Sequence, residues 1–281
     1  MFKPVCLTLL MLLSLSFNSI GQTLDLGIQV GGGAYSGDLS TPGLTSYLQN
    51  VNPAVGGFLR VGLSRGITLR AGLLYTQVEA QDRNSGVEWR TQRDLAFSSR
   101  IFEGSIISEV HPLAWWRSSD ARSISPYIFG GIGLFRFNPQ ANINGTQVDL
   151  QPLGTEGQGM PGYAPRYDLH GLVVPFGIGL RWESGKWIID LEYGVRWTDT
   201  DYIDDVSMDY VAYDELLENN GALAAMLGNK IDAPTGTQRG NPDVNDWFGV
   251  AVLSFAYRLN FNNSRYIRGV KGRKPLDCPK F

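Results

Sequence analysis

Residues 187–198 alternate between apolar and polar side chains along their whole length. One parity is apolar throughout and has tryptophan at both ends: Trp187, Ile189, Leu191, Tyr193, Val195 and Trp197. The other parity carries the charged residues Asp190, Glu192 and Arg196. Successive side chains of a β-strand point to opposite faces, so the pattern predicts a strand with one face in an apolar medium. Strands of soluble sandwiches also alternate, but an unbroken apolar face that starts and ends with Trp is typical of contact with lipid.

The same alternation, less regular in places, recurs in seven other segments. They are residues 24–34, 55–63, 67–75, 94–110, 127–137, 172–182 and 247–259. The connections are short at 64–66, 111–125 and 184–186 and long at 37–53, 78–93, 139–168 and 198–245. Outer-membrane barrels have short periplasmic turns and long extracellular loops. The sequence therefore predicts an all-β fold, an eight-stranded antiparallel up-and-down transmembrane β-barrel of the cell outer membrane, with long extracellular loops and both termini periplasmic.

The two ends of the chain are predicted to lie outside the barrel. Met1–Lys3 is positively charged, and Val5–Phe17 is apolar but shorter than the ~20 residues of a membrane-spanning helix. Small residues at positions 19 and 21 then predict cleavage before Gln22. We expect a signal peptide at 1–21, an outer-membrane β-barrel at 22–259 and a basic periplasmic tail at 260–281.

Composition narrows the possible functions. A net charge of −3 argues against a nucleic-acid partner, and an aromatic content of 11% argues against disorder. Once the predicted signal peptide is removed, only Cys278 remains, so we expect neither an internal disulfide nor a zinc site at that residue. Gly31–Gly33 is not a phosphate-binding loop, since no Lys-Ser or Lys-Thr pair follows it. We expect no cofactor and no metal.

The predicted lumen is rich in charge. An eight-stranded barrel has an interior just wide enough for side chains. Eight charged side chains, four of each sign, are predicted to face it: Arg60, Arg70, Glu103, Glu109, Arg181, Asp190, Glu192 and Arg196. Buried charges persist when they are paired. We therefore expect a salt-bridged lumen that is closed to diffusion.

Several stretches together resemble a known family. In chain order they are Ala34–Leu39 (AYSGDL), Arg93–Phe97 (RDLAF), Leu153–Gly159 (LGTEGQG), Pro175–Leu180 (PFGIGL), Thr200–Ser207 (TDYIDDVS) and Cys278–Phe281 (CPKF). They are similar to the small outer-membrane barrel proteins of Bacteroidetes typified by PorG. The resemblance implies a membrane component of the type IX secretion system, which exports proteins and in some relatives supports gliding. It also implies association with a periplasmic ring of a lipoprotein, PorK, and its partner PorN, although the family has paralogues of unknown role.

Catalytic residues are scarce. The chain has two histidines, and the predicted topology puts His111 and His170 at opposite faces of the membrane. A hydrolase needs a nucleophile within hydrogen-bond reach of a base, and nothing in the sequence ties Ser99 or Ser108 to the candidate base region Asp168–His170. We therefore expect no enzyme. A stand-alone barrel for envelope stability or surface ligand binding remains an alternative, and a lipid A-modifying enzyme is a weaker one.

The fourth long loop is acidic. Eight acids follow one another with no Lys or Arg between them: Asp199, Asp201, Asp204, Asp205, Asp209, Asp214, Glu215 and Glu218. We interpret the run as a solvated loop that faces divalent-rich lipopolysaccharide, with a structural Ca²⁺ site as the alternative, because closely spaced oxygen ligands suit that ion. The spacing does not match an EF-hand loop. Apolar residues at helical spacing predict a helix at Tyr213–Lys230 that packs over the barrel mouth.

The tail is the predicted partner-binding segment. It combines positive charges with the apolar residues Tyr266, Ile267 and Val270, and interface hot spots are enriched in aromatic and Arg side chains. The residues expected to contact the periplasmic ring are Arg265, Arg268, Lys271, Arg273, Lys274, Cys278 and Phe281. The alternative contact is the turn 111–125, with its Trp115–Arg117 stretch. Outer-membrane lipid and lipopolysaccharide are the other expected partners.

Overall fold

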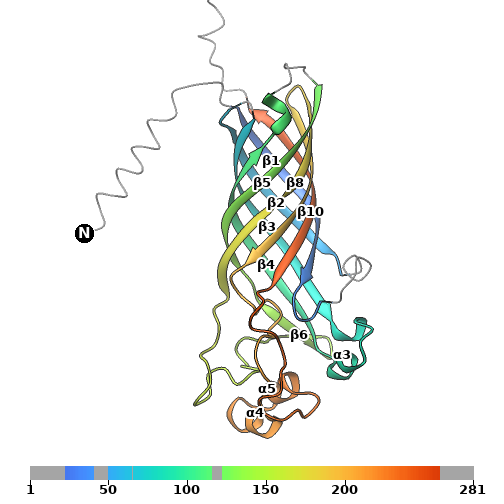
Figure 1. The fold of residues 1–281 in the computed structure, drawn as a ribbon, viewed down its shortest axis with the longest axis vertical. Coiled ribbons are helices and arrows are strands. Elements are labelled where there is room, and N and C mark those ends of the chain that lie inside the picture. Colours follow the sequence, from blue (N-terminus) through green and yellow to red (C-terminus); the bar gives the residue numbers. More distant parts are fainter. Residues whose placement is uncertain (1–22, 41–49, 65, 116–121, 260–281) are drawn as a thin grey trace, which may run out of the picture.

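The protein is a closed eight-stranded antiparallel β-barrel, as predicted. The computed structural model describes residues 23–40, 50–64, 66–115 and 122–259. The barrel strands are β1 (Leu24–Ser36), β2 (Asn52–Gly62), β3 (Ile67–Gln81), β4 (Ala96–Val110), β5 (Arg122–Arg136), β8 (His170–Ser184), β9 (Trp187–Thr198) and β10 (Trp247–Leu259). β1 pairs with β10, and β3 pairs with β4, so the sheet closes on itself (Figure 1). The predicted signal peptide and tail lie outside the described residues. Within the described ranges, no helix has the length and hydropathy needed to cross a bilayer.

The register fixes the tilt of the strands. The residue opposite Leu24 on β2, the residue opposite that one on β3, and so on around the barrel form a path that returns to β1 at Ala34. Ala34 is ten residues farther along β1 than the starting point (34 minus 24). A stagger of this kind accompanies strands that are inclined to the barrel axis by roughly 35–45°. Leu24 lies opposite Leu259, so β1 starts and β10 ends at the same end of the barrel, which we call the short-turn end.

The outer surface of the barrel is apolar. Trp187, Leu191 and Trp197 of β9 are 62%, 59% and 46% exposed, whereas Asp190 and Glu192 between them are buried. Ten residues separate the two tryptophans, which is ~33 Å along a strand and ~25 Å along the axis at this tilt. That height matches the apolar band of outer-membrane barrels. The parity predicted for this strand is confirmed, and the molecule is a transmembrane barrel of the outer-membrane type.

Some strand boundaries differ from the prediction. β5 begins at Arg122 rather than residue 127, because its pairing with β8 continues down to Ser184 beside the short turn. Residues 94 and 95 are not in β4, since Asp94 takes a left-handed conformation (φ 47°) that ends the helix α3 (Glu88–Arg93). β3 continues six residues past the predicted end at Tyr75, paired with β4.

The third long loop contains a hairpin that was not predicted. β6 (Pro139–Ile143) and β7 (Thr146–Asp149) pair with each other, and β6 extends the sheet beside β4 through Ser98 and Gln140. The turn is Asn144–Gly145, with φ values of 51° and 86°. An Asn-Gly pair between short alternating segments is a hairpin signal that was available in the sequence. Both strands are too short to cross a membrane, so the hairpin adds to the loop and not to the barrel.

The predicted helix at 213–230 is two short helices. α4 (Tyr213–Asn219) and α5 (Ala222–Gly228) are separated at Asn220–Gly221, where Gly221 has a φ of 90°. They lie at the tip of the long-loop end, away from the barrel rim (Figure 1). Leu216 of α4 packs on Met160 of the third loop, and Leu227 of α5 joins the main core. The pair therefore helps to build a cap of loops rather than lying directly on the mouth. The remaining short helices are η2 (Asp82–Asn84) and η3 (Pro112–Trp115).

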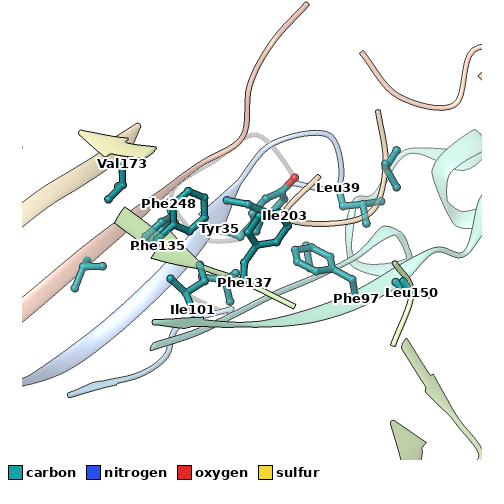
Figure 2. Packing of buried hydrophobic residues seen from close by; sticks show 14 of the residues in the cluster. Tyr35, Leu39, Phe97, Ile101, Phe135, Phe137, Leu150, Val173, Ile203 and Phe248 are labelled. Atoms are coloured by element: carbon teal, nitrogen blue, oxygen red, sulfur yellow. The ribbon is translucent and has the colours of Figure 1, made fainter. Parts of the chain in front are cut away.

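Large side chains fill the barrel interior. Toward the long-loop end the core contains Tyr35, Ile101, Phe135, Phe137 and Phe248, together with loop residues (Figure 2). Nearer the short-turn end, aromatic rings lie over glycines of neighbouring strands. A Cβ on Gly179 would lie 2.3 Å from the Tyr127 ring, and one on Gly27 would lie 2.3 Å from the Phe58 ring. Glycine at these inward positions gives the rings the room that closes the lumen.

Candidate functional site

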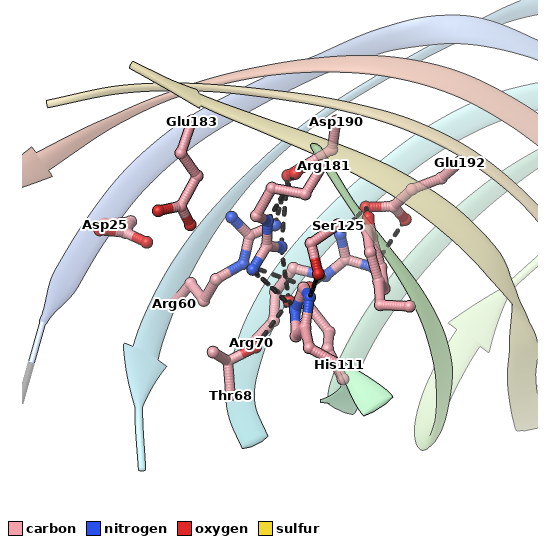
Figure 3. Close-up of polar contacts among 12 residues, drawn as sticks. Asp25, Arg60, Thr68, Arg70, His111, Ser125, Arg181, Glu183, Asp190 and Glu192 are labelled. Carbon is pink, nitrogen blue, oxygen red and sulfur yellow. Dashed lines mark hydrogen bonds and ion pairs between the residues drawn. The ribbon is translucent and has the colours of Figure 1, made fainter. Parts of the chain in front are cut away.

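The predicted lumen charges form one network near the short-turn end. Glu109 of β4 is its centre and forms ion pairs with three guanidinium groups, those of Arg60 at 3.0 Å, Arg70 at 3.2 Å and Arg181 at 2.7 Å. Thr68 also donates to this carboxylate, at 2.6 Å. Arg60 of β2, Thr68 and Arg70 of β3 and Arg181 of β8 point into the barrel interior (Figure 3). The alternation of each strand aims them inward, and only closure of the barrel brings them together.

Two further carboxylates complete the charge balance of this network. Asp190 binds Arg60 at 2.6 Å and Arg181 at 2.7 Å. Glu192 binds Arg70 and accepts from the Tyr127 hydroxyl at 2.6 Å. Three cations therefore face three anions. Farther along the lumen, Arg196 and Glu103 lie 3.5 Å apart.

All eight charges predicted to face the lumen are buried. Removing a charge from water is costly unless it is paired, so the network acts as a polar plug and not as a pore lining.

The structure brings one histidine and one serine together at this plug. His111 Nδ1 lies 3.2 Å from Ser125 Oγ, and His111 Nε2 lies 3.0 Å from the Arg181 guanidinium. A guanidinium only donates, so Nε2 is the accepting nitrogen and the proton of the neutral ring is on Nδ1, directed at Ser125. A general base needs a free lone pair facing its serine. The orientation is therefore the reverse of that in a hydrolase, and the contact is structural.

The other candidate catalytic residues are not assembled. His170 is exposed at the start of β8, at the end of the barrel opposite to His111. Ser99 is buried and accepts from the Asn138 N–H, whereas Ser108 has the outward parity of β4. Over the described ranges, no three His, Cys, Asp or Glu side chains gather in a way that could hold a metal ion.

The acidic run of the fourth loop is not a uniformly solvated segment, and that interpretation was wrong for three of its eight members. Asp201, Asp204 and Asp205 are 6%, 1% and 1% exposed. Burial raises the pKa of Asp201 to about 8, that of Asp204 to about 7 and that of Asp205 to about 6. These three side chains are therefore buried inside the folded long loops, which we call the cap.

The Tyr35 hydroxyl links Asp204 to a second buried carboxyl group, and the two carboxyl groups share one proton through it. The Tyr35 hydroxyl lies 2.6 Å from Asp204 Oδ2 and 2.5 Å from Asp246 Oδ1. A phenol has one proton to donate, so the second short contact requires a proton on one of the two carboxyl groups. Burial and the nearby Asp204 accordingly raise the pKa of Asp246 well above its usual value. This unit ties both ends of the fourth loop to β1.

The two most specific stretches of the predicted family resemblance bind each other. Thr155 donates to Asp205 at 2.5 Å, and the Tyr167 hydroxyl donates to the same carboxylate at 2.5 Å. Glu156 accepts from the backbone N–H of Ser207 at 3.0 Å and from Arg239 at 2.6 Å. The third and fourth loops are thus locked into one cap, and these motifs have a structural role.

A family assignment follows from the sequence. Residues 4–222 match the family DUF6089, which is described as a domain of unknown function. The chain belongs to this family. The matched range includes every barrel strand of this DUF6089 member up to β9, together with the two interlocking loop stretches. No curated protein matches the sequence.

Solved structures similar to this DUF6089 protein are outer-membrane barrels. Neisserial surface protein A is 7% identical, with a TM-score of 0.41 over 85% of this chain and 100% of its own. Ail, the attachment invasion locus protein of Yersinia pestis, is 11% identical, with a TM-score of 0.38 over 85% and 100%. A major outer membrane protein of Thermus thermophilus is 12% identical, with a TM-score of 0.38 over the same shares. Likenesses this weak carry no argument about the function of this chain.

The residues predicted to contact a partner lie outside the described part of the chain. This holds for every predicted contact residue of the tail and for Trp116 and Arg117 of the alternative turn. The functional features that sequence reasoning missed are the proton shared beside Tyr35 and the Arg239–Glu156 pair. Both depend on loops that meet only in the folded cap.

Proposed function

We propose that the protein is a non-enzymatic outer-membrane component of a type IX secretion or gliding apparatus that anchors a periplasmic ring of the PorK/PorN type. The filled lumen supports an anchoring role. A balanced charge network and packed aromatic rings occupy the interior, so the barrel is suited to holding a position in the membrane. The sequence resemblance to PorG-like proteins supports the choice of apparatus. The reversed His111–Ser125 orientation supports a role without catalysis.

The basic tail is the proposed contact with the ring. β10 ends at Leu259, opposite Leu24, so the tail leaves the barrel at the short-turn end. In the proposed orientation this end faces the periplasm, where the ring lies. Complementary charge speeds encounter, and the aromatic and Arg residues of the tail supply the contacts that lower the dissociation rate.

The decisive experiment deletes Lys271–Phe281 from the tagged, full-length protein in its own cells. We expect the truncated barrel to keep its heat-modifiable gel migration, because all eight strands are retained, but to lose co-purification of the ring protein and to reduce secretion. A matched control replaces Arg83 and Arg166, two exposed arginines at the long-loop end, with glutamine. Ring recovery at the wild-type yield from truncated cells would refute the tail as the contact.

The alternative function is a stand-alone barrel that stabilises the envelope or binds a surface ligand. The folded cap of the long loops favours it, since the Thr155–Asp205 and Glu156–Arg239 contacts build a rigid surface outside the membrane. A deletion strain distinguishes the proposals. Normal secretion with increased detergent sensitivity supports the stand-alone barrel, lost secretion supports the apparatus, and a changed lipid A mass supports an enzyme.

A further inference from the structure

Three neighbouring strands carry a basic side chain at the same level of the outer surface. Arg136 of β5 lies directly opposite His170 of β8 and Phe102 of β4. Arg100 is two residues from Phe102 toward the long-loop end, so it is the diagonal neighbour of Arg136 on the same face. Diagonal positions on one face are ~7–8 Å apart, within reach of long side chains. Arg100, Arg136 and His170 are all exposed. We call these three residues the basic rim.

The basic rim lies directly above the apolar band. On β5 and β8 the next outward residues toward the membrane are Leu134 and Leu172, and on β4 the next is Phe102. Leu172 is ten residues from Trp182 along β8, the same spacing as between the two tryptophans that mark the band on β9. Each member of the rim is therefore the first outward residue beyond the hydrocarbon level. Lipid headgroups occupy this level.

The rim arginines have no partner in the described part of the protein. Every other arginine whose side chain is described there makes a hydrogen bond or an ion pair, whereas Arg100 and Arg136 make none. Three acids lie on neighbouring positions of these strands and their loops: Glu79, opposite Ser98 on β3, Asp168, two residues before His170, and Asp199, which accepts from the Leu172 N–H. Among the described residues, none of the three forms an ion pair with the rim. Two unpaired cations on an otherwise acidic end of the molecule favour an anionic ligand.

An apolar groove begins just below the rim on the same strands. It has a volume of about 820 Å³ and extends from β1, β2 and β3 to the rim strands, where Gly104, Ile106, Ile132, Leu134 and Leu172 line it. Gly104 lies between Leu73 and Leu134 across the sheet, and its missing side chain, with those of the small outward residues Gly57 and Ala71, leaves the hollow. A ligand held at the rim and in the groove has an anionic head and an apolar chain.

We propose that the basic rim and the groove below it form a binding site for a phosphate-bearing lipid of the membrane leaflet on the long-loop side. Arg100 and Arg136 bind the phosphate, since the planar guanidinium pairs with phosphate oxygens through two parallel hydrogen bonds. His170 adds a ring nitrogen beside Arg136. One acyl chain lies in the groove over Gly104, where the outward wall of leucine and isoleucine side chains is interrupted.

The test measures lipid binding to the full-length barrel by native mass spectrometry in detergent, with lipid A, phosphatidylglycerol and phosphatidylcholine as probes. The double variant Arg100→Gln/Arg136→Gln is expected to weaken binding of the anionic probes, lipid A and phosphatidylglycerol, by about tenfold or more. This factor corresponds to the loss of at least one charge-assisted contact. The control Arg83→Gln/Arg166→Gln removes the same charge from exposed loop positions at the same end. It is expected to bind all three lipids as the wild type does. Heat-modifiable gel migration confirms that each variant is folded.

A second variant tests the groove. A Cβ on Gly104 would meet only Leu73 Cδ2, at 3.5 Å, so Gly104→Leu extends outward without disturbing the lumen. We expect it to weaken binding of long-chain lipid A and phosphatidylglycerol, but not of short-chain phosphatidic acid. A loss confined to lipid A in the rim variant identifies the phosphorylated glycolipid as the ligand, and a loss with both anionic probes identifies lipid phosphate in general. Wild-type binding by the rim variant, or an equal loss in the control, would overturn the proposal.

Discussion

The strongest stability prediction concerns Glu109→Gln. The wild-type plug balances Arg60, Arg70 and Arg181 against Glu109 and two other carboxylates, and all six groups are buried. Glutamine keeps the shape of the side chain but removes its charge. Asp190 would then be the carboxylate paired with both Arg60 and Arg181. Three guanidinium groups would face two carboxylates, so one positive charge would lack compensation.

The expected cost is a large share of the stability of the barrel. Removing one partner from a buried ion pair costs about 3–5 kcal/mol, because a desolvated charge remains. Natural domains are stable by only about 5–15 kcal/mol. We therefore expect Glu109→Gln to fold in reduced yield and to unfold at a clearly lower urea concentration. A control, Glu218→Gln, removes an exposed acid of α4 and is expected to change stability by less than about 0.5 kcal/mol.

The assay is urea unfolding in lipid vesicles, followed by tryptophan fluorescence and by heat-modifiable gel migration. The double variant Glu109→Gln/Arg60→Met restores the charge balance by removing one cation, so its cost should be well below the sum of the two single costs. A single cost below about 1 kcal/mol, or strict additivity in the double variant, would refute the assignment of this network as a balanced plug.

Three further predictions test the barrel exterior, the lumen packing and the cap. Leu191→Arg places a charge on the lipid face near mid-strand and should cost ~2–4 kcal/mol, measured as lost assembly into vesicles. Gly179→Ala sets a Cβ 2.3 Å from the Tyr127 ring and should cost ~1–3 kcal/mol in urea unfolding, whereas Gly130→Ala, with nothing within 4 Å, should be near neutral. The raised pKa of Asp246 means that its contribution to cap stability is complete below the unfolded value near 3.8 and is lost as pH rises through the folded value. Hydrogen exchange of the fourth loop, corrected for intrinsic rates, should therefore increase from about pH 5 to about pH 9 in the wild type and stay flatter in Asp246→Asn, and equal profiles would contradict the shared proton.

The barrel could be predicted from the alternation of residues alone. A strand in lipid must turn one parity to the bilayer, so the period of two is imposed residue by residue and can be read without knowing any partner. This is why Trp187, Leu191 and Trp197 were placed outward correctly, and why the eight lumen charges were identified before their contacts were known. The alternation of short and long connections then fixed the up-and-down order.

Some strand ends, one hairpin and the split of one helix could not be predicted from the residue pattern. The strand ends beyond the membrane, such as residues 76–81 of β3, reverse the lipid pattern, because Val78 and Ala80 are buried and the polar residues Gln77 and Glu79 face outward. The hairpin at Asn144–Gly145 had a turn signal, but its four-residue and five-residue strands offered no periodicity to compete with a loop assignment. The split of the predicted helix was visible only as the interruption at Gly221.

The chemistry of the cap and the rim depends on contacts that form only when distant parts of the chain fold together. Asp204 and Asp205 look like solvated loop acids in the sequence, because their donors, Tyr35 and Thr155, are separated from them by 169 and 50 residues. Burial and the shared proton follow from those long-range contacts, which no local pattern encodes. The same holds for the pair of Arg100 and Arg136, since only the register of β4 against β5 places them side by side. Parity is a property of one strand, whereas a site is a property of several strands brought together by closure.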